Sequence, residues 1–526
     1  MLLETKGLGD ASEGDLAVVR PGRGRAKLEH VLGRAQDIEA VLEGLLVQRG
    51  LREPFEPFDP PEPSIAGRVD LRDLLTFTID PETAKDFDDA ISARREADGV
   101  RVWVHIADVS YFVQGGTPLD GGAARRAFST YVPGRVAPML PPELADDLCS
   151  LRAGVDRLCV TVEVAPGGGA SFYRSVIRSD ARLDYGQAQR IVTGAEAAEP
   201  ELAEALALAN GVSEDLRSRR FARGALRIES REVEFAFDGH GGVERAWRGQ
   251  EPAAHALIEE LMILANEQVA GLLAGRRREA LYRVHERPDP QSIQLLLAKL
   301  AALEVPTPPA PEHLSPSEAA RLAGEISDAV SAYVQRAGRG REAFPSLVLR
   351  ALKQARYHPH NLGHSGLASP AYCHFTSPIR RYPDLVVHRA LLRELGLSDE
   401  PLPGGLEDLA EHASAREREA ADVEHLADAL CAAWLLDKEL FLRGWGEAWE
   451  GEIVGLIGAG IFVRFGGVFE GFLPARRLPG DWFELDATAT RMQGRRAGRV
   501  YRLGDPLVVK VERIERPTGK VELSPG

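Results

Sequence analysis

The sequence contains little cysteine for its length, and this scarcity restricts the kinds of site it can form. The chain has 4 cysteines in 526 residues, and none lies in a CxxC pair or in another spacing typical of zinc ligands. A disulfide scaffold needs a denser set, whereas isolated free thiols are typical of a reducing compartment. The positions are Cys149, Cys159, Cys373 and Cys431.

Long apolar runs and an excess of positive charge are also missing. No run of about 18 apolar residues occurs, and the opening MLLETKGLGD has neither the basic start nor the apolar centre of a secretory signal. We therefore expect a cytoplasmic protein without a membrane partner. The 64 basic and 79 acidic residues give a formal net charge of −15. This balance argues against nonspecific coating of nucleic acid, so any nucleic-acid site must be local.

The length predicts about three structural units, since a domain ordinarily has about 100 to 200 residues. Residues 1–64 contain two extended stretches, a basic turn with Arg23 and Arg25, and a helix that starts at Asp37 and stops at Gly50. A proline-rich linker, FEPFDPPEP, follows. This pattern predicts a small N-terminal β/α module, either a truncated OB-like fold or a helix-turn-helix-like unit with a β-ribbon.

The middle of the chain has an α+β pattern. Strand-like stretches such as VRVWVHIADV alternate with helix-like ones such as HALIEELMILANEQVAGLLAG, and PTPPAPEHLSP is typical of a surface loop between helices. Further helices are expected over residues 325–356 and 384–395. From Gly451 onward, short strands with regular glycines predict a small β-barrel.

Four aspartates are concentrated in the segment TIDPETAKDFDDA, residues 78–90. Two carboxylates about 4 Å apart repel by about 4 kcal/mol at an effective dielectric constant near 20, so a converging set needs a cation. Carboxylate oxygens suit Mg²⁺, whereas an EF-hand is excluded because Ile91 stands where its bidentate glutamate would be. A solvated acidic turn remains the alternative. The four residues are Asp80, Asp86, Asp88 and Asp89.

A second polar segment, HFTSPIRRYPDLVVHRAL, spans residues 374–391. Pro383 and Asp384 suit the first turn of a helix, so Arg380 and Arg381 lie just ahead of its N-terminus. Free backbone N–H groups beside guanidinium groups form a good site for a phosphodiester. The alternative is that both arginines either lie along apolar surface with their charged ends in water or pair with carboxylates.

These motifs together resemble the catalytic RNB domain of the RNase II/RNase R exoribonucleases. The resemblance covers residues 64–443, and the tail from Gly451 is similar to the S1-type OB fold that follows this domain in the family. It implies domains at 1–64, 65–443 and 446–526. Family members usually carry two cold-shock domains in front, and 64 residues cannot hold both. The motifs are DPETAKDFDDA, HIADVSYFV, YVPGRVAPMLPPELADDLCSL, IEELMILAN, YRVHERP and GHSGLASPAYCHFTSPIRRYPDLVVHRAL.

The resemblance implies a monomeric, processive 3′-to-5′ hydrolase that degrades single-stranded RNA to nucleoside 5′-monophosphates with one or two Mg²⁺ ions. The four aspartates match metal ligands of the family. Asp88 also matches the aspartate that is most important to catalysis. Arg380 matches the arginine that contacts the scissile phosphate. The remaining matches concern the substrate, and we add Arg381 to them. Tyr131 matches a base-stacking aromatic, Tyr185 and Glu260 match positions that select RNA over DNA, and Glu417 matches a residue near the terminal nucleotide.

The barrel sequence adds aromatic candidates for RNA binding. Phenylalanines interleave with arginines, as in OB folds that hold single strands by stacking, with Phe462 and Phe469 as the expected contacts. Alternation along IFVRF also requires about half of these rings to face the barrel core. Three histidines are open to either a ligand or a structural role. They are His105, His285 and His364.

Two functions of other classes compete with the exoribonuclease. A non-catalytic RNA-binding protein that uses the RNB fold as a scaffold would be expected to lack an aspartate or the arginine, and all are present. A phosphohydrolase of small molecules would have no use for the S1-type tail. The small N-terminal module further predicts digestion into structured RNA that carries a 3′ overhang.

Overall fold

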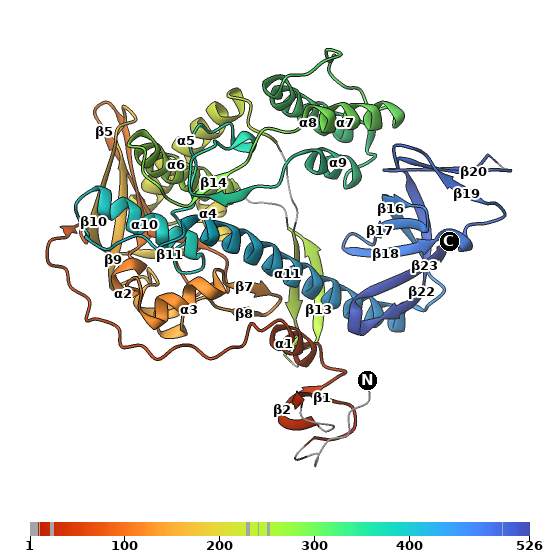
Figure 1. Ribbon diagram of the computed structural model, residues 1–526, viewed down its shortest axis with the longest axis horizontal. Helices are drawn as coiled ribbons and strands as arrows, with labels where there is room; N and C mark the ends of the chain where they lie inside the picture. Colours follow the sequence, from red (N-terminus) through yellow and green to blue (C-terminus); the bar gives the residue numbers. More distant parts are fainter. Residues whose placement is uncertain are drawn as a thin grey trace.

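The structure is a computed structural model that describes residues 9, 11–21, 26–227, 232–239, 241–249, 253–496 and 498–526. The predicted basic turn at Arg23 and Arg25 lies outside these residues. Figure 1 shows an α+β body on one side, a β-barrel on the other, and the long helix α11 (Leu406–Arg443) running between them. No helix in the described part of the chain is long and apolar enough to cross a membrane.

The N-terminal module consists of a β-ribbon and one helix. Strand β1 (Asp15–Pro21) pairs antiparallel with β2 (Ala26–Arg34), and α1 (Ile38–Gln48) follows with Asp37 as its N-cap. Residues 11–21 and 26–64 contain this ribbon and one helix, which agrees with a small β/α module, and the choice between a truncated OB-like fold and a helix-turn-helix-like unit stays a prediction. Gly50 adopts a φ of +71° just after the helix, and the proline-rich linker then runs without regular structure, as predicted.

The α+β body is built on a seven-stranded mixed sheet in the order β11-β4-β5-β6-β9-β10-β3. The pairs β11·β4 and β10·β3 are parallel and the other neighbours are antiparallel. The strands are β3 (Val69–Asp70), β4 (Phe77–Asp80), β5 (Asp89–Glu96), β6 (Gly99–Ala107), β9 (Asp156–Val164), β10 (Ala170–Arg178) and β11 (Ala181–Asp184).

Helices cover both faces of this sheet. One apolar cluster joins strand residues to α4, α5 and α6, and another joins the opposite face to α2, α3 and the start of α11, while α10 contributes to both. The helices are α2 (Val109–Phe112), α3 (Pro118–Arg126), α4 (Tyr185–Val192), α5 (Pro200–Ala222), α6 (Ala253–Gly275) and α10 (Tyr382–Glu394). Small two-stranded sheets join β7 (Thr130–Val132) to β8 (Arg135–Ala137), β12 (Val233–Phe237) to β13 (Val243–Arg248), and β14 (Tyr282–Val284) to β15 (Arg356–His358).

A helical layer connects the body to the barrel. It contains α7 (Pro290–Ala302), α8 (Pro316–Ala337) and α9 (Ala343–Ala351), and the predicted surface loop separates α7 from α8. Ser315 and Glu318 form a capping box at the start of α8. The helix expected over residues 325–356 is interrupted, because Gly338 and Gly340 adopt φ values of +62° and +73° that end α8.

The C-terminal domain is a closed five-stranded barrel in the order β16-β17-β18-β23-β22, as predicted. Its strands are β16 (Ala448–Ile457), β17 (Gly460–Phe465), β18 (Phe469–Pro474), β22 (Pro506–Glu515) and β23 (Lys520–Pro525). A separate three-stranded sheet is inserted between β18 and β22, formed by β19 (Phe483–Leu485), β20 (Arg491–Gly494) and β21 (Val500–Arg502). One apolar cluster runs through the barrel, α1, α7–α9 and α11, so these parts pack as one body. We keep the limits 1–64, 65–443 and 446–526 as a proposal for the domains.

Candidate active site

The four aspartates meet at one end of the central sheet. Asp80 is the last residue of β4 and Asp89 is the first of β5, while Asp86 and Asp88 lie in the loop between these strands. Because β4 and β5 are antiparallel neighbours, the loop between them begins and ends at the same end of the sheet. Local sequence and strand pairing therefore bring all four carboxylates to the same side of the molecule.

The aspartate loop is fixed by backbone contacts. The Ser150 hydroxyl donates to the carbonyl of Lys85 at 2.6 Å and accepts from the N–H of Phe87 at 3.1 Å. The carbonyl of Phe87 accepts from Leu151, and that of Asp88 accepts from Ala107, both within the described structure. These contacts hold the chain on each side of Asp86, so the carboxylates project from a rigid loop.

The environment of these carboxylates disfavours their charge. Burial and then the neighbouring Asp89 raise the pKa of Asp80 to about 8, and burial raises the pKa of Asp89 to about 6. Burial also raises the pKa of Asp88 well above its usual range, although the Arg380 charge opposes this. One oxygen of Asp80 and one of Asp88, both Oδ2, are buried without a hydrogen bond. Such oxygens need a cation or a proton.

The donor set suits a hard divalent cation. Carboxylate oxygens are the ligands that Mg²⁺ prefers, and two buried oxygens without hydrogen bonds are open to it. Among the described residues, no three acidic, histidine or cysteine side chains are grouped closely enough to enclose an ion as they stand. The four aspartates thus share one end of the sheet but do not form a closed set of ligands in this arrangement.

Arg380 and Arg381, although adjacent, have different surroundings. The Arg380 side chain is 47% exposed, and its Nε lies 3.6 Å from Oδ2 of Asp88. Arg381 instead places a two-pronged contact on the buried carboxylate of Asp384, at 2.9 and 2.8 Å. Arg380 is therefore available to an anion, whereas Arg381 holds the start of α10. For Arg381 the structure favours the alternative, pairing with a carboxylate, over the expected contact with substrate.

Three side chains hold the loop that precedes Arg380, two from distant segments and one from the first turn of α10. Asn266 Oδ1 accepts from the N–H of Phe375, and Asp384 Oδ1 accepts from that of Ser377, each at 2.8 Å. Asp88 Oδ1 accepts from the N–H of Ile379, also at 2.8 Å. Asn266 was not singled out from the sequence, although it is a polar residue in the apolar run IEELMILAN. Its buried amide also donates to the hydroxyl of Tyr372 at 3.1 Å.

Tyr131 and Tyr185 both lie beside the aspartates. Tyr131 sits in the β7–β8 hairpin, its hydroxyl donates to Asp86, and its backbone N–H donates to Glu424 on α11 at 2.8 Å. Tyr185 begins α4, directly after β11. Burial, followed by the charges of Asp89 and Asp80, raises the pKa of Tyr185. Glu424 is an additional site residue that no sequence motif identified.

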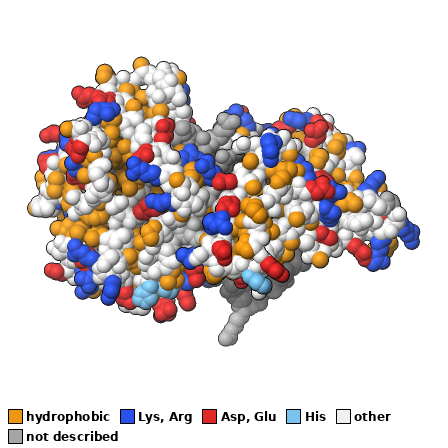
Figure 2. All heavy atoms as spheres, turned by 90° about the horizontal axis from the view of Figure 1, so that it is seen from above, with side chains coloured by type: hydrophobic (Ala, Val, Ile, Leu, Met, Phe, Trp, Pro, Cys, Tyr) orange, Lys and Arg blue, Asp and Glu red, His pale blue; other side chains and the backbone are white. Residues whose placement is uncertain are grey.

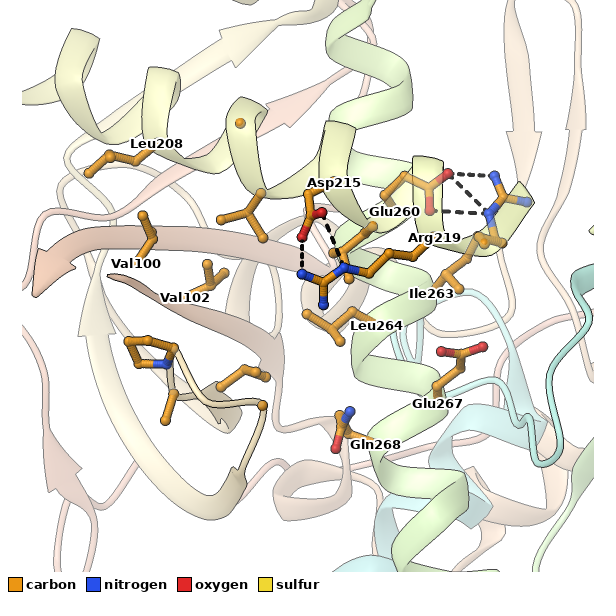
Figure 3. A pocket seen from close by; sticks show the side chains of 18 of the residues that line it. Val100, Val102, Leu208, Asp215, Arg219, Glu260, Ile263, Leu264, Glu267 and Gln268 are labelled. Atoms are coloured by element: carbon orange, nitrogen blue, oxygen red, sulfur yellow. Dashed lines mark hydrogen bonds and ion pairs between the residues drawn. The ribbon is translucent and has the colours of Figure 1, made fainter. Parts of the chain in front are cut away.

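Glu260 and Glu417 are engaged by arginines rather than by the aspartate site. Glu260 is only 2% exposed, and it accepts hydrogen bonds from the guanidinium of Arg220 at 2.5 to 3.1 Å (Figure 3). Glu417, on α11, pairs with Arg283 at 2.7 Å. Neither glutamate is free to bind a nucleotide in this arrangement, so the expected roles of both need their arginines to move.

Glu260 also lines a separate cavity of about 650 Å³. This cavity lies between helices α5 and α6 and the outer parts of β5, β6 and β9, with Val100, Val102 and Leu208 on its apolar wall (Figure 3). Its lining residues include none of the four aspartates and not Arg380. The two sites are therefore distinct features of the body.

The three candidate histidines have structural partners. His105 is buried between the hydroxyls of Ser92 and Thr161, and burial lowers its pKa to about 3. His285 contacts the backbone at Lys353 and Gly366, and His364 accepts from a backbone N–H. Hydrogen-bonded neutral imidazoles of this kind stabilise the fold, which favours the structural alternative for all three.

The barrel aromatics divide between core and surface. Phe465 pairs with Phe469 and Phe462 pairs with Phe472 across the β17–β18 hairpin. Phe469 is 5% exposed and packs against Trp449 with ring centroids 5.9 Å apart, whereas the half-buried Phe462 and Phe472 rings lie together at 5.0 Å. About half of the rings face the core, as expected, but Phe469 is one of them. Its expected contact with RNA is therefore contradicted by its burial, while Phe462 remains available.

Charge of one sign does not dominate the surface shown in Figure 2. Figure 2 shows basic, acidic and apolar side chains interspersed over the face that it presents. This distribution agrees with the formal net charge of −15. Binding of a polyanion must therefore rely on local sites such as Arg380.

Comparison with known proteins gives two matches to family models. The model of the RNB domain matches residues 68–396, and that of the S1 RNA binding domain matches residues 445–525. Ribonuclease R of Escherichia coli is 37% identical over 500 residues, which cover 90% of this chain and 59% of that protein. Ribonuclease R of Aquifex aeolicus is 35% identical over 99% of this chain and 76% of its own length. The chain thus spans less than two thirds of its Escherichia coli relative.

A solved structure agrees with these matches. Mycoplasma genitalium RNase R in complex with ribose-methylated single-stranded RNA superposes with a TM-score of 0.87 at 26% sequence identity. The superposition covers all of this chain, 100%, and 85% of the other. From its aspartate loop to its barrel, this chain belongs to the family of proteins that carry an RNB domain, with an S1 RNA binding domain at its C-terminal end.

Proposed function

We propose that this protein is a 3′-to-5′ exoribonuclease that hydrolyses single-stranded RNA to nucleoside 5′-monophosphates. The observation that carries the proposal is the pairing of an exposed arginine, Arg380, with the buried carboxylate of Asp88 at 3.6 Å, beside three further aspartates. A group of buried carboxylates that favours a cation, next to a half-exposed guanidinium, matches the charges of a metal-bound phosphodiester. The names of the relatives, Ribonuclease R, support the same activity.

The chain's own residues supply binding and orientation. Asp80, Asp86, Asp88 and Asp89 would hold one or two Mg²⁺ ions, which when bound activate water and stabilise the leaving oxygen. Arg380 reaches the scissile phosphate with a planar guanidinium, which can form two parallel hydrogen bonds to its oxygens. Asp88 restrains this guanidinium and, through Ile379, the backbone before it.

The aromatic residues near the aspartates would position the nucleotide. Tyr131 is held at its hydroxyl by Asp86 and at its N–H by Glu424, so its ring is a fixed surface for a base. Tyr185 lies on the opposite connection, after β11, close enough for the charges of Asp89 and Asp80 to raise the pKa of its hydroxyl. A hydroxyl donor beside the last ribose is a means of distinguishing RNA from DNA, because only RNA offers the 2′-OH.

Two alternatives have less support. A non-catalytic scaffold would have no need to keep four aspartates and an exposed arginine together, given the electrostatic cost of this arrangement. A phosphohydrolase of small molecules would not need the S1 domain at residues 445–525. The monomeric state and a cytoplasmic location are part of the proposal for the RNA hydrolase.

The test is digestion of a 5′-labelled single-stranded RNA with Mg²⁺, resolved on a sequencing gel and by chromatography of the small products. We expect a shortening ladder and nucleoside 5′-monophosphates, with no digestion of DNA of the same sequence. The same reaction with a chelator added should show no digestion of the RNA. Internal cleavage, products with 3′-phosphates, or shortening from the labelled 5′ end would contradict the assignment.

Structured RNA tests how the substrate reaches the aspartates. A hairpin with a graded 3′ overhang should be digested into the duplex once the overhang is long enough to reach Asp88. The shortest productive overhang then measures the depth of the site. Stalling at a constant distance before the duplex, for every overhang, would show that structured RNA is not a substrate.

A further inference from the structure

The sheet inserted into the barrel domain carries an exposed tryptophan among arginines. Trp482 immediately precedes β19 and is 78% exposed. Residues 476–502 contain seven arginines and three acidic residues, in a chain whose formal net charge is −15. Basic side chains appear at the end of Figure 2 that corresponds to the position of β19–β21 in Figure 1. This insert is therefore a local basic site on an acidic protein.

The strand register places the tryptophan beside one of these arginines. The ladder pairs Glu484 with Gln493, and the carbonyl of Trp482 accepts from the N–H of Arg495 at 2.9 Å. Because side chains alternate along a strand, Trp482 and Glu484 share the face that also carries Gln493 and Arg495. The ion pair between Arg495 and Glu484 agrees with this placement.

The opposite face of the same sheet packs inward. Met492 is buried, and the rings of Phe483 and Tyr501 lie 5.5 Å apart against the apolar cluster of the barrel. The insert is thus anchored on one face, which fixes the direction of the other. Trp482 lies on the other face of the sheet and takes no part in this packing. Its ring is therefore exposed although the sheet that carries it is well packed.

Two further arginines lie at the tip of the β20–β21 hairpin. The N–H of Arg496 donates to both carboxylate oxygens of Asp481, at 3.0 and 2.9 Å, and the N–H of Gly494 donates to the carbonyl of Arg499 at 2.8 Å. These contacts hold the backbone of Arg496 beside Asp481 and that of Arg499 beside Gly494, close to Trp482. Arg496 and Arg499 are exposed, and within the described residues neither guanidinium forms an ion pair.

We propose that this face is a second contact for single-stranded RNA, separate from the Phe462 and Phe472 rings on the barrel. One base stacks on Trp482, and Arg496 and Arg499 hold the adjacent phosphates. Aromatic platforms beside cations bind single strands without regard to sequence. The inference rests on the proposed function, because it takes the substrate of that function as the ligand.

The composition of the face favours RNA over a protein partner. The centres of protein interfaces are depleted in charged residues, whereas Trp482 is surrounded by them. The Arg495–Glu484 pair is exposed to solvent and therefore weak, so a phosphate can take the place of Glu484. An exposed aromatic ring among basic side chains thus suits single-stranded RNA, which offers both bases and phosphates.

The first experiment measures binding of 2′-O-methyl oligonucleotides to the full chain by fluorescence anisotropy. One oligonucleotide of about 8 residues fits a single binding site, and one of about 30 extends beyond it. We expect Trp482→Ala to weaken binding of the longer RNA by about 5- to 150-fold, the loss of one stacked base, and to leave binding of the shorter one unchanged. Phe441→Ala, which removes another exposed ring, is the matched control.

The second experiment measures the salt dependence of the same binding. Each phosphate contact in a single strand contributes about 0.7 to the slope of log K against log salt, so Arg496→Ala/Arg499→Ala should lower the slope by about 1.4. The double variant Arg336→Ala/Arg350→Ala, with exposed arginines on α8 and α9, should retain the wild-type slope. Circular dichroism confirms that each variant is folded.

The outcomes separate this inference from the proposed function. If the wild-type protein neither binds nor digests RNA, the proposed function fails. If it digests RNA, and both insert variants bind the longer RNA like the wild type, only the role of the insert is overturned. A wild-type dimer that Trp482→Ala dissociates, with RNA affinity unchanged, would assign the face to a second copy of the chain and would also overturn the inference.

Discussion

Arg380 lies against the carboxylate of Asp88, its Nε 3.6 Å from Oδ2, while the other oxygen of the same carboxylate binds the N–H of Ile379. One buried aspartate thus controls both the side chain of Arg380 and the backbone directly before it. The contact joins the loop after β4 to a loop 291 residues later in the chain. The position of the arginine relative to the aspartates is therefore built into the fold.

The first prediction concerns Asp88→Asn. The amide oxygen can still accept from Ile379, so the fold is kept, but the negative oxygen that faces Arg380 is lost. We expect turnover of single-stranded RNA to fall at least about a hundredfold, as for other losses of one electrostatic group in an active site. Affinity for RNA should change little. Asp98→Asn, in the exposed β5–β6 turn, is the control, and equal losses of turnover and affinity would contradict the role of Asp88.

The second prediction contrasts the two neighbouring arginines. Arg380→Lys removes the planar fork from a half-exposed side chain, so we expect lower turnover with an unchanged melting temperature. Arg381→Lys disrupts the two-pronged contact with buried Asp384, so the free energy of unfolding should fall by about 1.5 to 3 kcal/mol. Turnover and thermal melting of both variants give the comparison. If Arg380→Lys keeps wild-type turnover, Arg380 is only a structural cation.

The sequence predicted the aspartate loop and the helix start beside Arg380 because each of these two features is local by itself. A short loop between neighbouring strands must bring Asp80 and Asp89 together, and a proline-initiated helix must place Arg380 at its N-terminus. The strand over residues 100–109, the helix over residues 255–275 and the small C-terminal barrel followed from the same short-range patterns. These features need no knowledge of long-range packing.

Other parts of the site depended on contacts that the sequence does not reveal. Glu260 meets Arg220 from another helix, 40 residues away, so its availability to substrate was overestimated. Phe469 faces inward because of the register of the β17–β18 hairpin, and alternation alone does not say which half of the rings is buried. Arg381 and Asp384 are three positions apart, a spacing at which pairing on the first helical turn was foreseeable.

The third prediction concerns Asn266 as a positioning residue. Asn266→Ala leaves the N–H of Phe375 and the hydroxyl of Tyr372 without their partner, which should cost about 1 to 3 kcal/mol of stability. Turnover should also fall, because the loop leading to Arg380 loses one of its three anchors. Gln268→Ala, two positions further along α6 and on a different face of the helix, is the control. A double-mutant cycle with Arg380→Ala should be non-additive in turnover, and strict additivity would leave Asn266 with a purely structural role.

The fourth prediction separates the two barrel phenylalanines. Phe462→Ala should weaken RNA binding by about 1 to 3 kcal/mol, the value of one stacked base. Phe469→Ala removes a buried ring and should lower the free energy of unfolding by about 3 to 5 kcal/mol. Binding isotherms and denaturant unfolding of both variants provide the measurement. A stable Phe469→Ala variant with impaired RNA binding would restore the role expected from the sequence.

The last prediction tests the cation with a measurement that does not depend on hydrolysis. The buried Oδ2 atoms of Asp80 and Asp88 accept no hydrogen bond, so a bound divalent cation should stabilise the folded state. At about 100 times its dissociation constant, an ion that binds only the folded protein adds about 2.7 kcal/mol of stability. We therefore expect Mg²⁺ to raise the melting temperature of the wild-type protein. Sodium chloride at the same ionic strength should give a lower melting temperature than Mg²⁺ does.

Asp80→Asn completes this test, because it removes both the cation's ligand and the burden of an unpaired buried carboxylate. In chelator, this variant should melt at or above the wild-type temperature, since an amide is less costly to bury than a charge. With Mg²⁺ the melting temperature of this variant should rise much less than that of the wild type. If Mg²⁺ stabilises the two proteins equally, the ion binds elsewhere and Asp80 is not a ligand. If Mg²⁺ stabilises neither while the wild type still digests RNA in chelator, the aspartates act without a divalent cation.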